Sequence, residues 1–135
     1  MNESKRKEEA HMTIQECYQN LGGSFEQVKN RLPSEGLIKK FTAKFLDDGS
    51  FSELCRAMQS GERKEAFRAA HTLKGVCANL SFDRLYASAE RLTELLRPEV
   101  DDIPEGAFSL LEAVRDDYEL TVNAIRDFLT ADGQL

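Results

Sequence analysis

A histidine, a lysine and a glycine stand close together in the segment AHTLKGVCANL, residues 70–80. His71 is one of two histidines in the chain, and Lys74 and Gly75 follow it after three and four residues. Imidazole is largely uncharged at neutral pH and can then act as a nucleophile. Phosphoryl transfer depends mainly on positioning and on neutralising the charge of the phosphoryl oxygens, which a nearby lysine can do. These residue types therefore suit a histidine that accepts a phosphoryl group and passes it on.

The segment from Glu62 to Asn79 is predicted to be helical, and its apolar positions place His71 on the opposite face. Spacings of four, three, four and three residues separate the apolar positions Ala66, Ala70, Leu73, Cys77 and Leu80. Since each helical residue advances by about 100°, this apolar arc lies roughly 140° to 260° from His71. We therefore expect the His71 side chain to be exposed.

Other side chains share or adjoin the face that carries His71. They are Phe67, Lys74, Gly75 and Ala78 at helical offsets, with Lys64 and Arg68 close by. The cations form either an anion-binding face or an ordinary solvated surface. Phe67 is interpreted equally well as a core residue or as an exposed docking residue. A glycine inside a helix costs about 1 kcal/mol relative to alanine, so Gly75 indicates that access beside His71 matters.

Other chemistries fit the sequence less well. No nucleophile and orienting acid complete a catalytic triad with His71. No metal site is predicted, because the other histidine, His11, is distant and the cysteines Cys17, Cys55 and Cys77 are too far apart in sequence to be convincing ligands. These cysteines are interpreted as reduced thiols, mostly in the core. A net charge of −6 argues against nucleic-acid binding, and the sequence has no apolar run long enough to span a membrane.

The whole chain is predicted to be helical, because the alternation typical of strands is absent. Glycines and prolines separate helical segments over residues 13–21, 24–32, 34–48 and 50–61, and longer ones over 62–79, 82–97 and 104–130. Ser24 is expected to cap a helix, Phe82 to lie in the core, and Pro104 to occupy the first turn of the last helix. We expect an all-α, up-and-down four-helix bundle with short additional N-terminal helices at one end. Residues 1–11 are expected to form a polar N-terminal extension, with Met1 and Met12 both candidate start residues.

The segment around His71 resembles the signature of histidine-containing phosphotransfer (HPt) domains, which is close to His-x-Leu-Lys-Gly followed by small residues. The matching residues are His71, Leu73, Lys74, Gly75 and Ala78. The resemblance covers roughly residues 13–130, and we assign an HPt domain to residues 12–135. Two positions depart from the family pattern. Ser81, which can still cap the next helix, stands where many members have glycine, and Thr93 stands where some have a glutamine that faces the phosphate.

The resemblance implies a phosphorelay intermediate. His71 would be phosphorylated on an imidazole nitrogen, Lys74 would support the phosphoryl oxygens, and Gly75 would give the partner room. Docking or minor contacts would come from residues around the site, namely Phe67, Arg68, Ala78, Lys64 and Thr93. The partner would be a receiver domain of a response regulator or a hybrid histidine kinase, with a phosphorylatable aspartate and a bound Mg²⁺. This chain would then need no cofactor or metal of its own.

The sequence has no recognisable ATP-binding or kinase-core segment, so we expect a phosphoryl carrier rather than an enzyme. A monomer is sufficient for this chemistry, and without an export signal we expect it to be cytoplasmic. One alternative is a non-phosphorylated helical adaptor that docks a receiver or another signalling partner through the His71 face. Another is a degenerate relay protein that still docks receivers. Acid-labile label taken from a phosphorylated receiver distinguishes a carrier from both.

Overall fold

The computed structural model describes residues 12–133, and this part of the chain is all-helical, as predicted. The elements in chain order are α2 (Ile14–Leu21), α3 (Phe25–Arg31), α4 (Glu35–Lys44), the 3-10 turn η1 (Phe45–Asp47), α5 (Ser50–Gln59), α6 (Arg63–Leu80), α7 (Asp83–Leu96) and α8 (Ala107–Ala131). The extension predicted for residues 1–11, with His11, lies outside the described residues.

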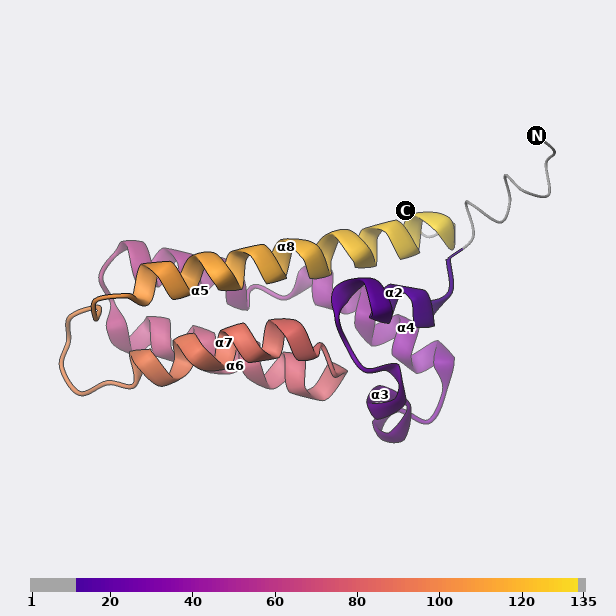
Figure 1. Ribbon diagram of the computed structural model, residues 1–135, viewed down its shortest axis with the longest axis horizontal. Helices are drawn as coiled ribbons and strands as arrows, with labels where there is room; N and C mark the ends of the chain where they lie inside the picture. The colour runs from indigo at the N-terminus through magenta and orange to yellow at the C-terminus, as the bar shows by residue number, and fades with distance from the viewer. Residues whose placement is uncertain (1–11, 134–135) are drawn as a thin grey trace.

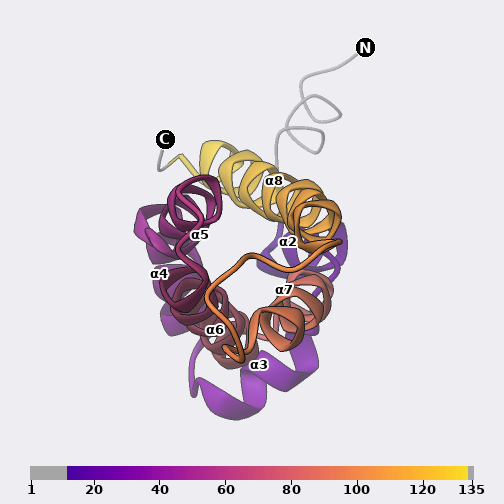
Figure 2. The same ribbon diagram turned by 90° about the vertical axis from the view of Figure 1, so that its left-hand side faces the viewer.

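Helices α5, α6, α7 and α8 surround a common interior (Figure 2). Each of them packs against the next one in the chain, and α2 packs against α8. Short connections, residues 60–62 and 81–82, leave α5, α6 and α7 as consecutive neighbours, whereas a longer loop, residues 97–106, leads from α7 to α8. Helices α2, α3 and α4 gather at one end of the molecule (Figure 1), where the short N-terminal helices were expected.

The segment over residues 34–48 contributes less to the bundle than its predicted length indicates. Its α-helix ends at Lys44, η1 follows, and Gly49 separates it from α5 as predicted. The carboxylate of Asp48 accepts a hydrogen bond from the backbone N–H of Ser50 at 2.9 Å, which helps α5 to begin there. The shorter helix α5 is the one that packs along α6. Helices α4 and α5 therefore follow one another along one side of the molecule (Figure 1).

The last helix begins later than predicted, because Pro104 lies in the preceding loop and not in the first helical turn. Gly106 has a φ of +89°, a left-handed conformation that interrupts the helix between Pro104 and Ala107. From Ala107 onward, the apolar residues expected on the inner side are buried, namely Leu111, Val114, Val122, Ile125 and Leu129, and Tyr118 is half-buried.

The turn between α2 and α3 docks on the turn between α6 and α7. The backbone N–H of Ser24 donates to the carbonyl of Ser81 at 2.9 Å. The hydroxyl of Tyr18 donates to the carbonyl of Leu80 at 2.8 Å. The last carbonyls of a helix have no partner within it, so these bonds satisfy the end of α6 and fix it to the N-terminal helices.

Ser81 ends α6, contrary to the expectation that its side chain caps α7. Its φ of +57° is the only positive φ of a non-glycine residue in the described part of the chain. Left-handed backbone is unfavourable for residues with a Cβ. The Ser81 hydroxyl accepts a hydrogen bond from Arg31 Nη1 at 2.7 Å, and the same guanidinium donates to the carbonyl of Ala78. These bonds offset part of the strain that serine has at this position.

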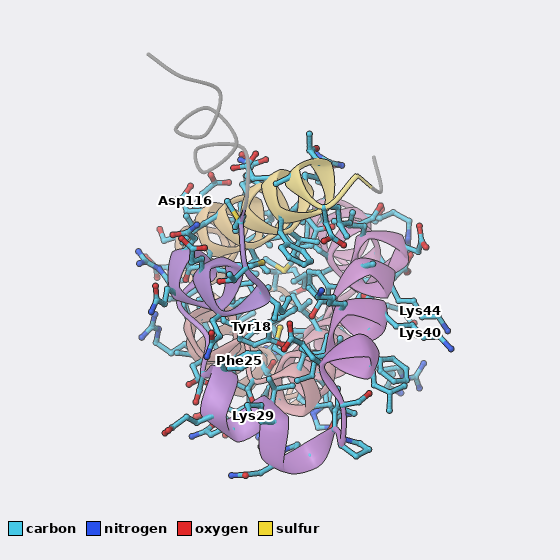
Figure 3. The ribbon with its side chains drawn as sticks, turned by 90° about the vertical axis from the view of Figure 1, so that its right-hand side faces the viewer. Tyr18, Phe25, Lys29, Lys40, Lys44 and Asp116 are labelled. Carbon is cyan, nitrogen blue, oxygen red and sulfur yellow. The ribbon has the colours of Figure 1, made fainter. Side chains whose placement is uncertain are left out.

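Aromatic rings fill the interior near this junction. Phe82 is fully buried, as predicted, and its ring lies 5.2 Å from that of Phe45 and 5.6 Å from that of Tyr18. Figure 3 shows Tyr18 and Phe25 among the helices, with Lys40 and Lys44 pointing outward from α4. Ser24 accepts from the backbone N–H of Gln27 at 3.2 Å, which confirms its predicted role as a helix cap.

We predict that Gly23→Ala destabilises the protein, because a Cβ at this position would lie 2.6 Å from the carbonyl oxygen of Ser81. The backbone on both sides is held by hydrogen bonds, so relief requires moving the two turns apart. We expect a loss of about 1–3 kcal/mol in the free energy of unfolding, measured by urea denaturation. Gly36→Ala is the matched control, since its Cβ meets only one atom, at 3.9 Å, and should be neutral or stabilising. Equal stabilities of the two variants would contradict the close packing at Gly23.

Candidate functional site

Helix α6 presents His71 to solvent, as its periodicity predicted. The seam positions Ala66, Ala70, Leu73, Cys77 and Leu80 are all buried, at 7% exposure or less. His71 is exposed, and so is Gly75 one turn later. The helix continues without a break through Gly75. The imidazole is therefore held on a rigid element and open to another molecule.

The Phe67 ring stacks on the His71 imidazole. The two ring centroids are 5.9 Å apart and the ring planes are inclined by 18°. The two residues are four positions apart on α6, so their side chains lie on the same face. Phe67 is half-buried and packs against the hydrophobic core on its other side. Its position is thus intermediate between the core residue and the exposed residue foreseen for it, and a docking role for Phe67 stays a prediction.

The end of α7 lies beside this aromatic pair. The guanidinium carbon of Arg97 is 5.6 Å from the centroid of the Phe67 ring. Arg97 also pairs with Glu94, with 2.8 Å between Nη2 and Oε2. The pKa of Glu94 lies below its ordinary value, mainly because Arg97 donates to its carboxylate, and the charges of Lys74 and His71 lower it further. The site therefore includes an acidic group and a guanidinium from α7.

Arg63 joins the start of α6 to the end of α7. Its guanidinium is buried and donates to four backbone carbonyls. Their donor–acceptor distances are 3.2 Å to Leu95, 3.2 Å to Leu96, 2.7 Å to Arg97 and 2.9 Å to Asp102. These carbonyls belong to the last turn of α7 and to the following loop, where the helix leaves carbonyls unpaired and carries partial negative charge. Arg63 therefore fixes where Glu94 and Arg97 stand relative to His71.

Gly75 leaves open space on the face that carries His71. A Cβ built on it would meet no heavy atom within 4 Å, apart from its own helix backbone and chain neighbours. The glycine is therefore not required for close helix packing. Ala78, one turn further on, is half-buried and small, and continues the cleared strip. Lys74 is half-buried, whereas Lys64 and Arg68 are exposed, and Arg68 pairs with Glu65 at 2.7 Å.

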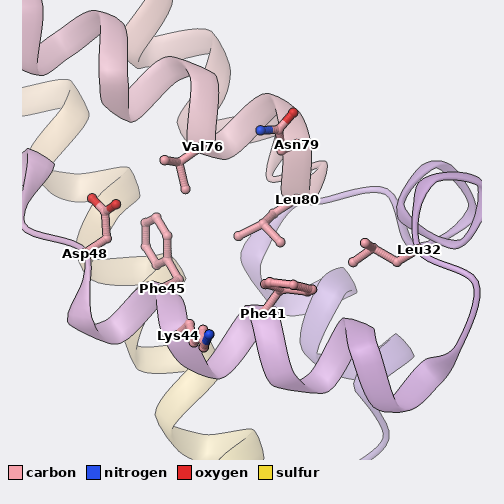
Figure 4. A pocket seen from close by; sticks show the side chains of 8 residues that line it. All are labelled: Leu32, Phe41, Lys44, Phe45, Asp48, Val76, Asn79 and Leu80. Atoms are coloured by element: carbon pink, nitrogen blue, oxygen red, sulfur yellow. The ribbon is translucent and has the colours of Figure 1, made fainter.

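A hollow of about 330 Å³ opens on the flank of α6 that faces α4 (Figure 4). It is lined by Leu32, Phe41, Lys44, Phe45, Asp48, Val76, Asn79 and Leu80. Its floor is mainly apolar, and Phe41 is a large apolar side chain that is 38% exposed. Asn79 lies about 80° around the helix from His71, with Gly75 about halfway between them. The hollow is therefore separated from His71 only by the cleared strip.

Thr93 does not stand on the exposed face, which differs from the expectation of a minor contact with the phosphate. Its side chain is fully buried, and its hydroxyl donates to the carbonyl of Ala89 at 2.7 Å. Leu92 and Leu96 are also buried, so position 93 belongs to the core side of α7. The next residue, Glu94, faces the site instead.

The cysteines do not form a reactive or metal-binding group. Cys17 and Cys77 are fully buried, and burial raises the pKa of each thiol, to about 12 for Cys17. Cys55 is half-buried, and burial raises its pKa although Arg115 lies close to its sulfur. Residues 12–133 contain no group of three or more acidic, histidine or cysteine side chains placed to hold a metal ion. Within the same residues, no helix is long and apolar enough to cross a membrane.

Sequence reasoning missed three residues at the site, namely Arg63, Glu94 and Arg97. Arg63 stands in a charged run that is typical of a solvated helix start. One signal was available for the α7 residues. A tight turn near residue 81 makes α6 and α7 antiparallel neighbours, and this arrangement brings the last turn of α7 beside Phe67 and His71.

We predict that Arg63→Met strongly destabilises the protein. It removes the donor to four carbonyls at the end of α7 and in the following loop, of which that of Leu96 is buried, and leaving a buried carbonyl without a donor costs about 1–3 kcal/mol. Arg63→Lys should recover only part of the loss, because an ammonium cannot reproduce the planar fork. Urea denaturation measures both variants, with Arg68→Met as the control, since Arg68 is exposed and its ion pair contributes little. Similar stabilities for Arg63→Met and Arg68→Met would refute the capping role.

The chain matches the model of a known protein family. A family model described as Hpt domain matches residues 37–128, which is more than half of the chain and includes His71 and the whole of α5, α6 and α7. No curated protein and no solved structure matches the chain significantly.

Proposed function

The chain belongs to the Hpt domain family, and we propose that it carries a phosphoryl group on His71 between two receiver domains, or from a kinase to a receiver. Members of this family act in histidine phosphotransfer in two-component phosphorelays, as phosphocarriers and not as catalytic kinases. The observation that carries the proposal is the exposed His71 on a rigid helix, with Lys74 one turn away and open space at Gly75.

Transfer to His71 needs one nucleophile and one leaving group. The lone pair of an imidazole nitrogen forms the N–P bond while the P–O bond to the receiver aspartate breaks. The aspartate leaves as a carboxylate with the electron pair, and the other ring nitrogen of His71 keeps its proton. Passing the group on is the reverse of this step with a second aspartate. No water or proton has to be supplied by the chain.

The remaining site residues have supporting roles in the proposal. Lys74 stabilises the equatorial oxygens of the phosphoryl group by its charge. Gly75 and Ala78 let the receiver bring its aspartate close to His71. Lys64 and Arg68 attract the partner's acidic site over a longer range, although Arg68 is shared with Glu65.

The partner proposed is a receiver domain of a response regulator or of a hybrid histidine kinase. The mainly apolar hollow on the flank of α6 supports docking near this face, because exposed apolar side chains such as Phe41 favour burial against a partner. The receiver would bring its own Mg²⁺, so the chain needs no cofactor. The proposal further includes a monomer in the cytoplasm, and an up-and-down four-helix bundle, which is supported by the sequential packing of α5 to α8.

The direct test is incubation of the chain with a phosphorylated receiver domain. Acid-labile label on the chain supports a carrier, whereas binding of the receiver without label indicates an adaptor or a degenerate relay protein. A receiver whose phosphorylatable aspartate is replaced by asparagine is the control for label that does not come from that aspartate.

We predict that His71→Gln abolishes phosphoryl acceptance and leaves the fold intact. The side chain is exposed, and only its stacking on Phe67 is lost. Label is measured after incubation with the phosphorylated receiver, and the fold is checked by circular dichroism melts. Full labelling of the variant would show that another residue carries the phosphate.

We predict that Gly75→Gln folds well and transfers poorly. Glutamine favours the helix over glycine by up to about 1 kcal/mol, and nothing lies within 4 Å of the position of its Cβ. The long glutamine side chain would stand between His71 and the receiver. Because misplacement of the reacting atoms by about 1 Å can lower a rate on the order of a hundredfold, the transfer rate should fall by about tenfold or more. Gly75→Ala is the matched control, which should gain stability and keep most of the transfer rate. A Gly75→Gln variant that transfers at the parent rate would show that this flank is not used.

A further inference from the structure

The Phe67 ring stacks on the His71 imidazole. We propose that Phe67 is a positioning residue that fixes the orientation of the imidazole for phosphoryl transfer. Arg97 assists by restraining the Phe67 ring. This inference rests on the proposed function, because it concerns how the acceptor nitrogen is presented.

The His71 ring has little else to orient it. Among residues 12–133, no hydrogen bond to the imidazole is found, the side chain is exposed, and the neighbouring Glu94 interacts with it only through charge. An exposed side chain without such a bond samples several rotamers. The Phe67 ring lies nearly parallel to it at an 18° inclination and 5.9 Å between centroids, in the range where aromatic pairs attract each other. Stacking therefore selects the ring orientations in which the two planes stay together.

A positioning residue must itself be held, and Phe67 is held on two sides. It packs against the hydrophobic core from its place on α6. Arg97 lies over its ring with 5.6 Å between the guanidinium carbon and the ring centroid, a favourable cation–π geometry. Arg97 also pairs with the exposed Glu94, and its backbone is fixed by Arg63, which donates to the Arg97 carbonyl at 2.7 Å. The buried Arg63 thus fixes the backbone of Arg97, Arg97 restrains the Phe67 ring, and the Phe67 ring restrains the exposed imidazole of His71.

The size of the effect follows from the strength of the stack. Aromatic pairs contribute about 0.5–1.5 kcal/mol beyond their buried area. If that energy restricts the imidazole to its reactive orientation, its loss corresponds to about a two- to tenfold decrease in transfer rate. The concentration of receiver that gives half of the maximal rate should not change, because the docking surface remains.

The test compares Phe67→Leu, which keeps apolar bulk against the core, with Phe67→Tyr, which keeps the ring. The first readout is the proton spectrum of the His71 imidazole, with His71→Gln used to assign its signals against those of His11. Ring currents from Phe67 shift these signals in the parent, and we expect the shift to be lost in Phe67→Leu and kept in Phe67→Tyr. Arg97→Gln should reduce it partly.

The second readout is the single-turnover rate of labelling His71 with phosphoramidate, a small phosphoryl donor, and with a phosphorylated receiver at increasing concentrations. With phosphoramidate, the imidazole nitrogen forms the N–P bond as the P–N bond of the donor breaks and ammonia leaves. We expect Phe67→Leu to lower the maximal rate with the receiver by about two- to tenfold, and Phe67→Tyr to restore it. Phe108→Leu, on an exposed aromatic of α8, is the control and should leave both readouts unchanged.

Unchanged imidazole signals in Phe67→Leu, or an unchanged maximal rate, would overturn the inference. A rise in the half-saturating receiver concentration alone would also overturn it, because Phe67 would then be a docking residue. Failure of the proposed function is recognised separately. In that case the parent accepts no label from the receiver, while labelling by phosphoramidate and the imidazole spectrum still report whether Phe67 positions His71.

Discussion

The buried guanidinium of Arg63 connects the first residue of α6 to the last turn of α7, and the surroundings of His71 depend on that connection. Apolar burial is not directional, so it does not by itself fix how two antiparallel helices are placed along each other. Four hydrogen bonds from one planar group to the carbonyls at the end of α7 and in the loop that follows it remove that freedom at one end. At the other end, the bonds from Ser24 and Tyr18 join the turn after α6 to the N-terminal helices, and the backbone N–H of Arg84 at the start of α7 donates to the carbonyl of Gly22 at 3.1 Å. The register in which Arg97 meets Phe67 is thus fixed from both sides.

The periodicity of a single helix carries much of the information about the site. The apolar seam of α6 determines which of its residues face outward, and so the exposure of His71, Gly75 and Lys64 follows from the sequence. The all-helical fold can also be predicted from the sequence, because the glycines, prolines and capping serines that begin and end helices act locally. These features depend on residues that are within a few positions of one another.

Most of the features that could not be predicted from the sequence depend on contacts between segments that are distant in sequence. The family resemblance made Thr93 a candidate for a minor contact, yet the core side of α7 includes position 93, and Glu94 takes the place beside His71. Arg63 looks like one more charged residue until the end of α7 is placed against it. Ser81 adopts a left-handed backbone that its type does not suggest, because Arg31 from α3 stabilises it there. Pro104 favours a helix start, but the left-handed Gly106 two residues later prevents it.

The contact between the N-terminal helices and the turn after α6 also has a consequence for the order of folding. The bond from Tyr18 to Leu80 joins residues 62 positions apart, and that from Arg31 to Ser81 joins residues 50 apart. Closing such long loops costs chain entropy before any contact forms, whereas α5, α6 and α7 meet through short connections. We expect the α5–α7 unit to form early and α2 and α3 to dock late. The helix that carries His71 would then form before α2 and α3 have docked. Weakening the contacts of α2 and α3 would therefore speed global unfolding more than it would slow refolding.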